Sequence, residues 1–342
     1  MLKKELVSIV TPCFNGEAYL DRYFESVIAQ TYSNIELVFV DDGSTDETFR
    51  IAESYRDALS DRGISYKLIH QENSGQAAAI NRGLEEVTGE YLTWPDSDDM
   101  MTTAAIEERV HYLQDHSEYG AVCCAVDCVA EDKLNCVVQR QRLAPALDGT
   151  FLFDALIREE GAYCTPVAYM VRTKLLFEVL GGRKIYETRA GQNWQLLFPL
   201  TYRYRCGYID RPLVSYVVRS SSHSHSVKSP EDQLQRTYDL EDVIQHVLPV
   251  MNMTDEDQVT YEHYVGVKYL KRRFILAIRL GDATLAQLEK DKLDKEFGSS
   301  ISRDFLFLFV RMGLGPAIYR LSRIVSPFRM LAENPTKRRG EK

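Results

Sequence analysis

The residues most able to do chemistry in this sequence are three aspartates within four positions, Asp96, Asp98 and Asp99. Neighbouring carboxylates in contact repel one another by about 1 kcal/mol in water and by several times that near a protein interior. A hard cation relieves this repulsion, and Mg²⁺ or Mn²⁺ commonly binds one or two protein carboxylates together with substrate phosphates. The alternative is a structural role, in which Asp98 or Asp99 caps a helix starting near Thr102.

A second polar segment, Asp41 to Asp46, follows a strongly apolar run. Gly43 allows a sharp turn there, and Asp42 can then offer an acceptor to a base or a ribose hydroxyl. A turn that caps a helix is the alternative interpretation. The region has neither a glycine-rich dinucleotide fingerprint nor a P-loop, which favours binding of phosphate mainly through a metal.

The elements that must position these residues follow a βαβ rhythm. Runs rich in β-branched and aromatic residues alternate with amphipathic stretches, which predicts a mostly parallel sheet with right-handed crossovers. In such sheets ligands bind beyond the carboxyl ends of the strands, so the polar segments should converge on one edge. The expected strands are 7–12, 35–40, 64–70 and 90–94, and the expected helices are 17–30, 45–59 and 76–87, the second with Ser44, Thr45 and Asp46 as cap candidates.

The pattern of apolar and polar residues is different in the rest of the chain. Its pattern is mixed from Ala121 to about Arg219, which favours antiparallel strands with short helices, and helical periodicity dominates beyond Ser229. We therefore expect an α/β domain over residues 1–227 and a helical C-terminal region over residues 228–342. The expected strands are 122–129, 137–143, 167–171, 203–209 and 213–218, and the expected helices are 231–247, 255–280 and 283–292.

Charge and cysteine content limit the classes of protein to which this chain can belong. The net charge of −9 argues against a nucleic-acid binder, which would need a basic face. Seven cysteines without a secretory signal indicate a reducing cytoplasm. The spacing of Cys123, Cys124, Cys128 and Cys136 matches no ordinary zinc pattern, so we interpret them as small apolar residues of a buried strand.

Three segments together resemble the family 2 glycosyltransferases of the GT-A fold. They are residues 7–48, residues 72–84 (ENSGQAAAINRGL) and residues 89–99 (GEYLTWPDSDD), and the match in order and spacing spans roughly residues 6 to 225. The resemblance implies an α/β GT-A domain that transfers a sugar, with inversion, from a nucleotide diphosphate donor. It also implies Mn²⁺ or Mg²⁺ on the diphosphate.

The resemblance assigns site residues as well. Asp96 and Asp98 match the DXD-like motif; Asp98 would ligate the metal, and Asp96 or Asp99 would contact ribose, sugar, metal or metal-bound water. Asp42 would contact the base or ribose. Thr11, Pro12 and Asn15 would lie beside the nucleotide, and Asn73 and Gln76 would lie near the donor or, alternatively, cap the helix that follows.

Two positions depart from the family pattern. Family members usually place a catalytic carboxylate where this chain has Asn193, which cannot take a proton at neutral pH. Either another group is the base, with Glu187, Asp210, His223 and His225 as the alternatives, or the alignment is shifted by a few residues. The neighbouring Trp194 would stack on an acceptor sugar or pack in the core.

The second departure concerns a histidine that completes the metal site in many family members. The aligned position holds Arg219, whose guanidinium could instead bind a phosphate by a bidentate contact. His223 remains an alternative metal ligand.

The C-terminal segment is basic and partly apolar. Residues 300–342 contain nine Lys and Arg against three Asp and Glu, and FLFLFV (305–310) is too short to span a bilayer. The segment is either a docking helix or a surface-lying helix that attaches peripherally to the inner face of the plasma membrane, where lipid-linked acceptors would be met.

The sequence thus favours transfer of a hexose or N-acetylhexosamine, from a UDP donor, to a glycan or lipid-linked acceptor in cell-surface polysaccharide synthesis. A non-catalytic nucleotide-sugar-binding subunit is the first alternative, because of Asn193. A nucleotidyltransferase is the second, although the chain has no glycine-rich loop with Arg or Lys near Thr11.

Overall fold

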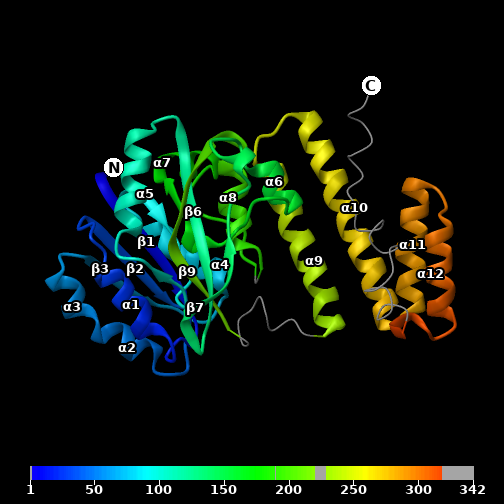
Figure 1. Cartoon of the computed structure of the whole chain (residues 1–342), viewed down its shortest axis with the longest axis horizontal. Coiled ribbons are helices and arrows are strands. Elements are labelled where there is room, and N and C mark those ends of the chain that lie inside the picture. The colour runs from blue at the N-terminus through cyan, green and yellow to red at the C-terminus, as the bar shows by residue number, and fades with distance from the viewer. Residues whose placement is uncertain (1, 189, 220–228, 318–342) are drawn as a thin grey trace. The chain divides into compact units, whose positions relative to one another are not determined.

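The structure is a computed structural model that describes residues 2–188, 190–219 and 229–317. Contacts divide the chain into two compact units, Met1–Ser222 with Pro249–Asn252, and His223–Leu248 with Met253–Lys342. Each unit has its own secondary structure, α/β in the first and helical in the second (Figure 1). The expected boundary at residue 227 lies outside the described residues and stays a prediction.

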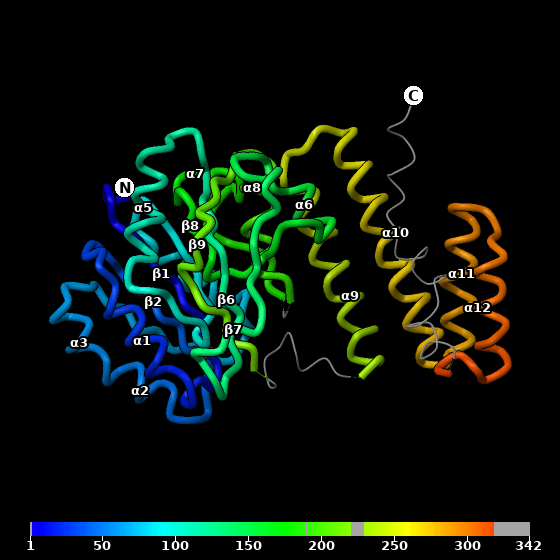
Figure 2. The backbone as a smooth tube through the Cα atoms, viewed as in Figure 1, coloured from blue at the N-terminus to red at the C-terminus, as the bar shows by residue number. Residues whose placement is uncertain are grey.

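A single mixed sheet organises the first unit. Within the described residues nine strands form it, in the order β3-β2-β1-β4-β8-β6-β9-β5, with β7 paired to β6 (Figure 2). The first four strands are all parallel, as the sequence predicts. Their bounds are β1 Lys3–Cys13, β2 Ile35–Asp41, β3 Ser65–His70 and β4 Gly89–Thr93.

The helices between these strands cover the sheet with apolar faces. Helix α1 (Leu20–Ile28) buries Leu20, Tyr23, Phe24 and Val27, which recur at helical spacing. Helix α4 (Gln76–Glu86) packs against β1 and β2, and three buried alanines follow its first residue, so its backbone lies close to the sheet. At Gly83 a Cβ atom would collide with the side chain of Val10, so only glycine allows this approach.

The structure corrects two expected elements of the first unit. The stretch 45–59 forms two helices, α2 (Thr48–Ser54) and α3 (Arg56–Asp61), and of the three cap candidates Asp46 accepts a hydrogen bond from the N–H of Thr48 at 3.0 Å. The two strands expected over 203–218 are one continuous strand, β9 (Arg205–Val218), because the register shifts on both sides of Pro212 and the strand stays paired to β6.

The second half of this unit is mixed rather than purely antiparallel. Strand β8 is antiparallel to β4 and β6, β7 to β6, and β5 to β9, whereas β9 runs parallel to β6. The remaining elements are β5 Met100–Met101, α5 Ala105–Asp115, β6 Tyr119–Ala130, β7 Lys133–Gln141, α6 Phe153–Arg158, β8 Tyr169–Arg172, α7 Thr173–Val179 and α8 Gln192–Arg203.

The cysteines of this half follow the sequence interpretation with one exception. Cys123, Cys124 and Cys128 are buried on β6. Cys136 is exposed, because it lies on the edge strand β7, which is largely solvent-facing.

The second unit consists of helices α9 (Pro230–Val247), α10 (Asp255–Leu280), α11 (Ala283–Phe297) and α12 (Ile301–Arg311). Side-chain caps start three of them: Ser229, Thr254 and Asp282 each accept a backbone N–H three residues on. The last three helices pack around a shared core of Phe274, Ala277, Ile278, Ala286, Leu293, Leu306 and Val310. None of the helices that the structure describes is long and apolar enough to cross a membrane.

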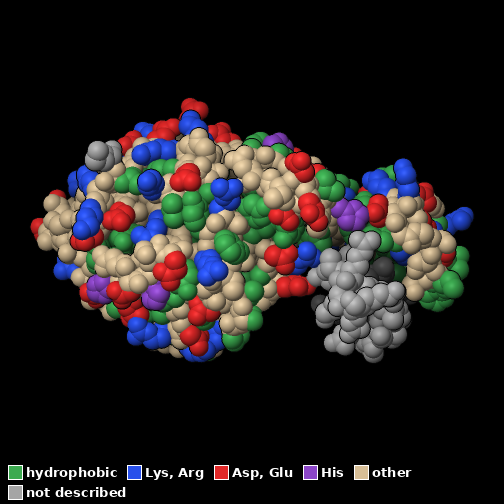
Figure 3. Space-filling model, turned by 90° about the horizontal axis from the view of Figure 1, so that it is seen from above, with side chains coloured by type: hydrophobic (Ala, Val, Ile, Leu, Met, Phe, Trp, Pro, Cys, Tyr) green, Lys and Arg blue, Asp and Glu red, His purple; other side chains and the backbone are tan. Residues whose placement is uncertain are grey.

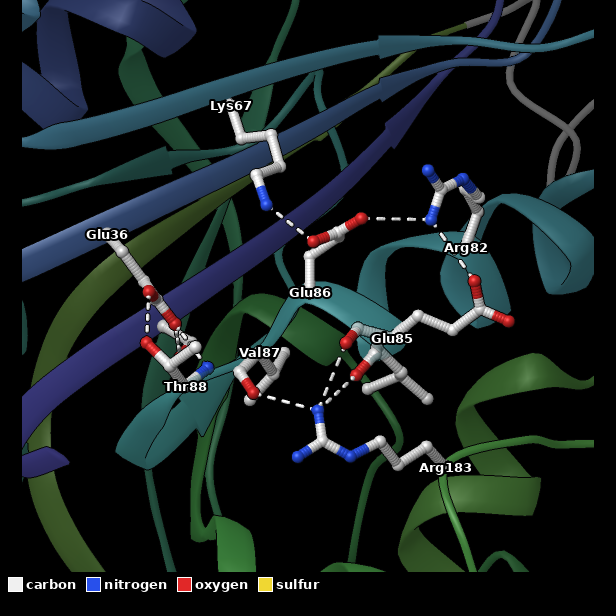
Figure 4. A network of polar contacts seen from close by, with 10 residues as sticks. Glu36, Lys67, Arg82, Glu85, Glu86, Val87, Thr88 and Arg183 are labelled. Carbon is white, nitrogen blue, oxygen red and sulfur yellow. Dashed lines mark hydrogen bonds and ion pairs between the residues drawn. The ribbon is translucent and has the colours of Figure 1, made fainter. Parts of the chain in front are cut away.

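A buried carboxylate joins three strands of the first unit, β1, β2 and β4 (Figure 4). Glu36 of β2 accepts hydrogen bonds from the hydroxyl group of Ser8, from the N–H and hydroxyl of Thr88 at 2.6 Å each, and from the N–H of Gly89 at 3.1 Å. Arg183 donates to the carbonyls of Leu84, Glu85 and Val87, which closes the end of α4. These contacts fix the sheet at the edge away from the aspartates.

We expect Glu36→Gln to destabilise the first unit by about 2 kcal/mol, because its amide nitrogen would face donors that need an acceptor. Both tryptophans of the chain, Trp94 and Trp194, lie in this unit, so tryptophan fluorescence during urea unfolding measures its stability. Glu53→Gln, which breaks an exposed ion pair with Arg56, should leave the midpoint unchanged. Equal midpoints for the two variants would contradict the role given to Glu36.

Candidate functional site

The carboxyl ends of the four parallel strands bring the polar segments together. In register, Cys13 at the end of β1 pairs with Asp41 at the end of β2, which in turn pairs with His70 at the end of β3. The aspartate segment 96–99 follows β4, which is paired to the other side of β1. The convergence expected from the sequence therefore occurs.

The three aspartates lie close enough to share one cation. One carboxylate oxygen from each of Asp96, Asp98 and Asp99 lies within 4.8 Å of the others. Gln76, at the first position of α4, donates to Asp96 at 2.6 Å, and the N–H of Val217 on β9 donates to Oδ1 of Asp99 at 3.2 Å. The cluster is thus held by residues from two distant parts of the chain.

Burial and neighbouring charge raise the pKa of two of these aspartates. Burial, with a further contribution from the charge of Asp98, raises the pKa of Asp96 to about 7. Burial followed by the charges of Asp98 and Asp96 raises the pKa of Asp99 well above its ordinary value. Each ionised carboxylate therefore disfavours ionisation of the next, and a bound divalent cation would favour the charged forms instead.

The residues present fit a divalent cation. Oδ2 of Asp99 is buried and has no hydrogen-bond partner among the described residues. A buried oxygen without a partner is costly unless a donor or a cation contacts it. Asp98 and Asp99 would hold Mn²⁺ or Mg²⁺ through oxygen ligands that suit either ion. The proposed further ligand His223 lies outside the described residues, as does the alternative base His225.

Arg219 directly follows β9 and contacts the cluster. Its Nε and Nη2 atoms donate to Oδ2 of Asp98 at 2.7 and 2.6 Å. Its guanidinium also lies over the ring of Tyr19, 4.2 Å from the centroid. Arg22 donates to the backbone carbonyl of Asp98 at 3.3 Å. Arg219 is a site residue predicted from the sequence, whereas Tyr19 and Arg22 are not.

The spacing of Tyr19 and Arg22 could have revealed them. They are three residues apart at the start of α1, directly after the polar loop that follows β1, so their side chains share one face of the helix near the strand ends. The pattern of residues 17–30 predicts only a helix there.

Asp42 shapes the loop between β3 and α4. Its two carboxylate oxygens accept from the side chain of Gln71 at 2.7 Å and from the N–H groups of Ser74 and Gly75 at 3.0 and 2.9 Å. This loop carries Asn73, which is exposed, and ends at Gln76. Asp42 therefore fixes the segment that supplies a partner of Asp96.

Three residues expected beside the nucleotide differ in their placement. Thr11 and Pro12 are buried within β1, and the hydroxyl of Thr11 is hydrogen-bonded to that of Tyr23. Asn15 is exposed at the strand end with φ of 52°, and its Oδ1 accepts from the N–H of Thr45 at 2.9 Å. Of the three, only Asn15 presents its side chain at the edge.

Asn193 lies at the start of α8 and reaches the aspartate loop. Its Oδ1 accepts from Nε1 of Trp94, two residues before Asp96, at 3.1 Å. The neighbouring Trp194 stacks on Phe198 at 5.6 Å between ring centroids.

The alternative bases lie elsewhere. Glu187 is exposed, with its Oε1 atom 3.4 Å from the side-chain nitrogen of Asn81. Asp210 is exposed on β9 and pairs with Arg142 at 2.8 Å. Neither belongs to the group formed by Asp96, Asp98 and Asp99.

Comparison with known proteins gives a family for this arrangement. The model of "Glycosyl transferase family 2" matches residues 8–180, about half of the chain. The chain is 40% identical over 113 residues to an uncharacterized glycosyltransferase of Haemophilus influenzae, covering 32% of this chain and 44% of the relative. It is 40% identical over 112 residues to glycosyltransferase GlyG of Streptococcus pneumoniae, covering 32% of this chain and 36% of the relative. The match spans less than half the length of these curated relatives.

Solved structures show the same fold. S. aureus TarS in complex with UDP-GlcNAc is similar with a TM-score of 0.58 and 18% identity, covering 93% of this chain and 92% of that one. The mannosyltransferase PcManGT from Pyrobaculum calidifontis, in complex with GDP-Man and Mn²⁺, is similar with a TM-score of 0.52 and 18% identity, covering 95% and 85%. At this identity the likeness concerns the fold, which is GT-A as expected.

Two glycines with nearly the same backbone conformation allow a test of how tightly the turn after β2 packs. Gly43 and Gly63 have φ of +74° and +71°, but a Cβ at Gly43 would lie 2.6 Å from the backbone nitrogen of Asn73, whereas one at Gly63 would meet nothing within 4 Å. We expect Gly63→Ala to cost about 1 kcal/mol through backbone strain alone. Gly43→Ala should cost at least about 1 kcal/mol more, because the loop holding Asn73 must move.

Tryptophan fluorescence during urea unfolding measures both variants. Equal losses of stability would show that the contact between the turn and the Asn73 loop is not tight.

Proposed function

Because the chain belongs to family 2 of the glycosyltransferases, we propose that it transfers a sugar from a nucleotide diphosphate donor to an acceptor hydroxyl, with inversion. The single observation that carries the proposal is the aspartate cluster. Carboxylate oxygens of Asp96, Asp98 and Asp99 lie within 4.8 Å of one another, and one buried oxygen of Asp99 has no partner among the described residues. Such a group suits a cation that also binds phosphates.

The residues around the cluster have separate proposed roles. Asp98 and Asp99 would hold the cation, which supplies charge neutralisation on the departing diphosphate. Arg219 can contact phosphate oxygens through two guanidinium nitrogens. Gln76 orients Asp96, and Asp42 keeps in place the loop that carries Gln76.

The acceptor side of the site is proposed to include Asn193. Its side chain is neutral, so it would orient the acceptor hydroxyl while another group takes the proton. The hydrogen bond from Trp94 ties its position to the loop that carries Asp96. In the transfer, the acceptor oxygen would bond to the sugar carbon from the face opposite the diphosphate, while the bond from that carbon to the diphosphate breaks and a base takes the hydroxyl proton.

For the donor we propose UDP-hexose or UDP-N-acetylhexosamine, and for the acceptor a glycan or lipid-linked glycan of cell-surface polysaccharide. In support, TarS, which shares the fold, is described in complex with UDP-GlcNAc, although PcManGT is described with GDP-Man. A thermal-shift panel of nucleotide sugars with and without Mn²⁺ tests this choice, because a ligand that binds the folded state raises its stability. A larger shift with GDP-sugars than with UDP-sugars would overturn it.

A non-catalytic nucleotide-sugar-binding subunit is the alternative that a specific observation favours. Asn193 occupies the start of α8, where the family resemblance leads us to expect a carboxylate base. This alternative predicts donor binding without turnover.

The Asp98→Asn variant tests the catalytic proposal. We expect loss of transfer or donor hydrolysis by about 10²-fold or more in the presence of Mn²⁺, because the substitution keeps the shape of the side chain but removes a charged ligand. Asp154→Asn, which affects an ion pair with Arg158 on α6, is the matched control and should keep full activity. The measurement is release of the nucleotide diphosphate. Donor binding without any turnover of the unsubstituted protein would favour the non-catalytic alternative.

We also propose that α12 attaches the protein peripherally to the inner face of the plasma membrane. Ile301, Phe305, Leu308 and Met312 recur at helical spacing and are 88%, 57%, 51% and 52% exposed. We call these four residues the apolar stripe, and Figure 3 shows hydrophobic side chains at the surface over α11 and α12. The sequence around and beyond the stripe is rich in Arg and Lys, which favours an anionic lipid surface.

The double variant Phe305→Ser with Leu308→Ser tests this attachment. We expect at least about tenfold weaker co-sedimentation with vesicles that contain phosphatidylglycerol, because two large side chains no longer enter the lipid. Val259→Ser removes an equally exposed apolar residue of α10 and should have no effect. Unchanged binding of the double variant would refute membrane contact through the apolar stripe.

A further inference from the structure

The guanidinium of Arg219 already pairs with the carboxylate of Asp98, which a divalent cation would need as a ligand. Arg219 places both Nε and Nη2 within 2.7 Å of Oδ2 of Asp98. The pair is well shielded from water, since the two side chains are 16% and 14% exposed. In such surroundings attraction between unlike charges is stronger than at the surface, so the pair is a substantial competitor for any other cation.

The surroundings of Arg219 hold it in this position. Its guanidinium lies over the ring of Tyr19 at 4.2 Å, an arrangement that attracts a cation to the aromatic face. The strand before it is anchored too, because the N–H of Val217 donates to Asp99 at 3.2 Å. Arg219 is therefore a well-placed partner of Asp98 and not a freely rotating surface residue.

The pair leaves the rest of the cluster uncompensated. Arg219 pairs with only one of the three carboxyl groups, and Arg22 donates to the backbone carbonyl of Asp98 rather than to its carboxylate. Oδ2 of Asp99 has no hydrogen-bond partner among the described residues. Because the ion pair of Arg219 involves the carboxylate of Asp98 alone, the cluster still favours a doubly charged ion that contacts the other carboxyl groups. That ion and Arg219 cannot both contact Oδ2 of Asp98 without strong mutual repulsion.

We propose that Arg219 is a displaceable latch on the cation site, an inference that rests on the function proposed above. Without donor, Arg219 pairs with Asp98 and weakens binding of a divalent cation. When a nucleoside diphosphate enters, the guanidinium transfers from the carboxylate to the phosphate oxygens, to which it is equally well matched. Asp98 is then free for the cation that the same phosphates bring.

The latch couples the two ligands. A cation that binds only the fraction of molecules with Asp98 released has an apparent affinity reduced by that fraction. The donor removes the penalty, and by thermodynamic reciprocity the cation then strengthens donor binding by the same factor. The site would consequently take up little metal until donor is present.

Calorimetric titration with Mn²⁺, in the absence and presence of UDP, tests the latch without any activity measurement. We expect Arg219→Gln to bind Mn²⁺ alone roughly tenfold more tightly than the unsubstituted chain. We also expect it to lose most of the enhancement that UDP gives to Mn²⁺ binding in the unsubstituted chain. Arg219→Met, which keeps the apolar stem over Tyr19, is the second variant and should behave in the same way.

The control is a similar ion pair away from the cluster. Arg140 on β7 donates to both carboxylate oxygens of Asp127, at 2.5 and 3.0 Å, so Arg140→Gln removes an arginine from a bidentate pair elsewhere on the same sheet. It should leave both the affinity for Mn²⁺ and its enhancement by UDP unchanged.

The results of these titrations distinguish a failure of the proposed latch from a failure of the proposed function. If the unsubstituted chain binds UDP with Mn²⁺ but both Arg219 variants bind Mn²⁺ alone no more tightly, the latch is refuted and the function stands. If UDP and other nucleoside diphosphates fail to bind with or without Mn²⁺, both are refuted. If UDP binds tightly while Mn²⁺ binds neither alone nor with UDP, Arg219 replaces the metal and the latch is again wrong.

Discussion

Mutual repulsion among three carboxyl groups is the constraint on which the rest of this structure depends. Asp96, Asp98 and Asp99 are held together at the end of β4 although burial and charge oppose their ionisation. Each contact that offsets the repulsion comes from another element: Gln76 from α4, the N–H of Val217 from β9, and the guanidinium of Arg219 just beyond that strand. A site of this kind stores unfavourable electrostatic energy that a cation with phosphates would release on binding.

The sheet explains how such distant contacts are possible. Parallel pairing of β1 with β2 and β4, and of β2 with β3, aligns the carboxyl ends of four strands. Strand β9 then pairs with both β6 and β5, which brings the end of β9 to the segment just after the aspartates. The turn at Gly43 and the loop held by Asp42 complete the edge, since the backbone of one approaches the backbone of the other too closely for a side chain.

Much of the fold could be predicted from sequence because its signals are local. The largely apolar run of β2 and the helical spacing of Leu20, Tyr23, Phe24 and Val27 are each visible in the pattern of a few residues. Errors arose where longer-range pairing decided the outcome. The sequence predicts a break between two strands around Pro212, yet register shifts on both sides of this residue keep β9 continuous and paired to β6. The sequence also predicts that Cys136 is buried, but this residue is exposed because it lies on an edge strand.

The sequence by itself determined the family, the parallel start of the sheet and the identity of the aspartates, because these are properties of residue type, order and spacing. Only the tertiary structure decided what each aspartate touches. It showed Thr11 buried against Tyr23, Asn193 bonded to Trp94, and Arg219 in contact with Asp98 over the ring of Tyr19. Residues 98 and 219 are 121 positions apart, so their pairing depends on how β9 returns to the sheet and leaves no trace in local periodicity.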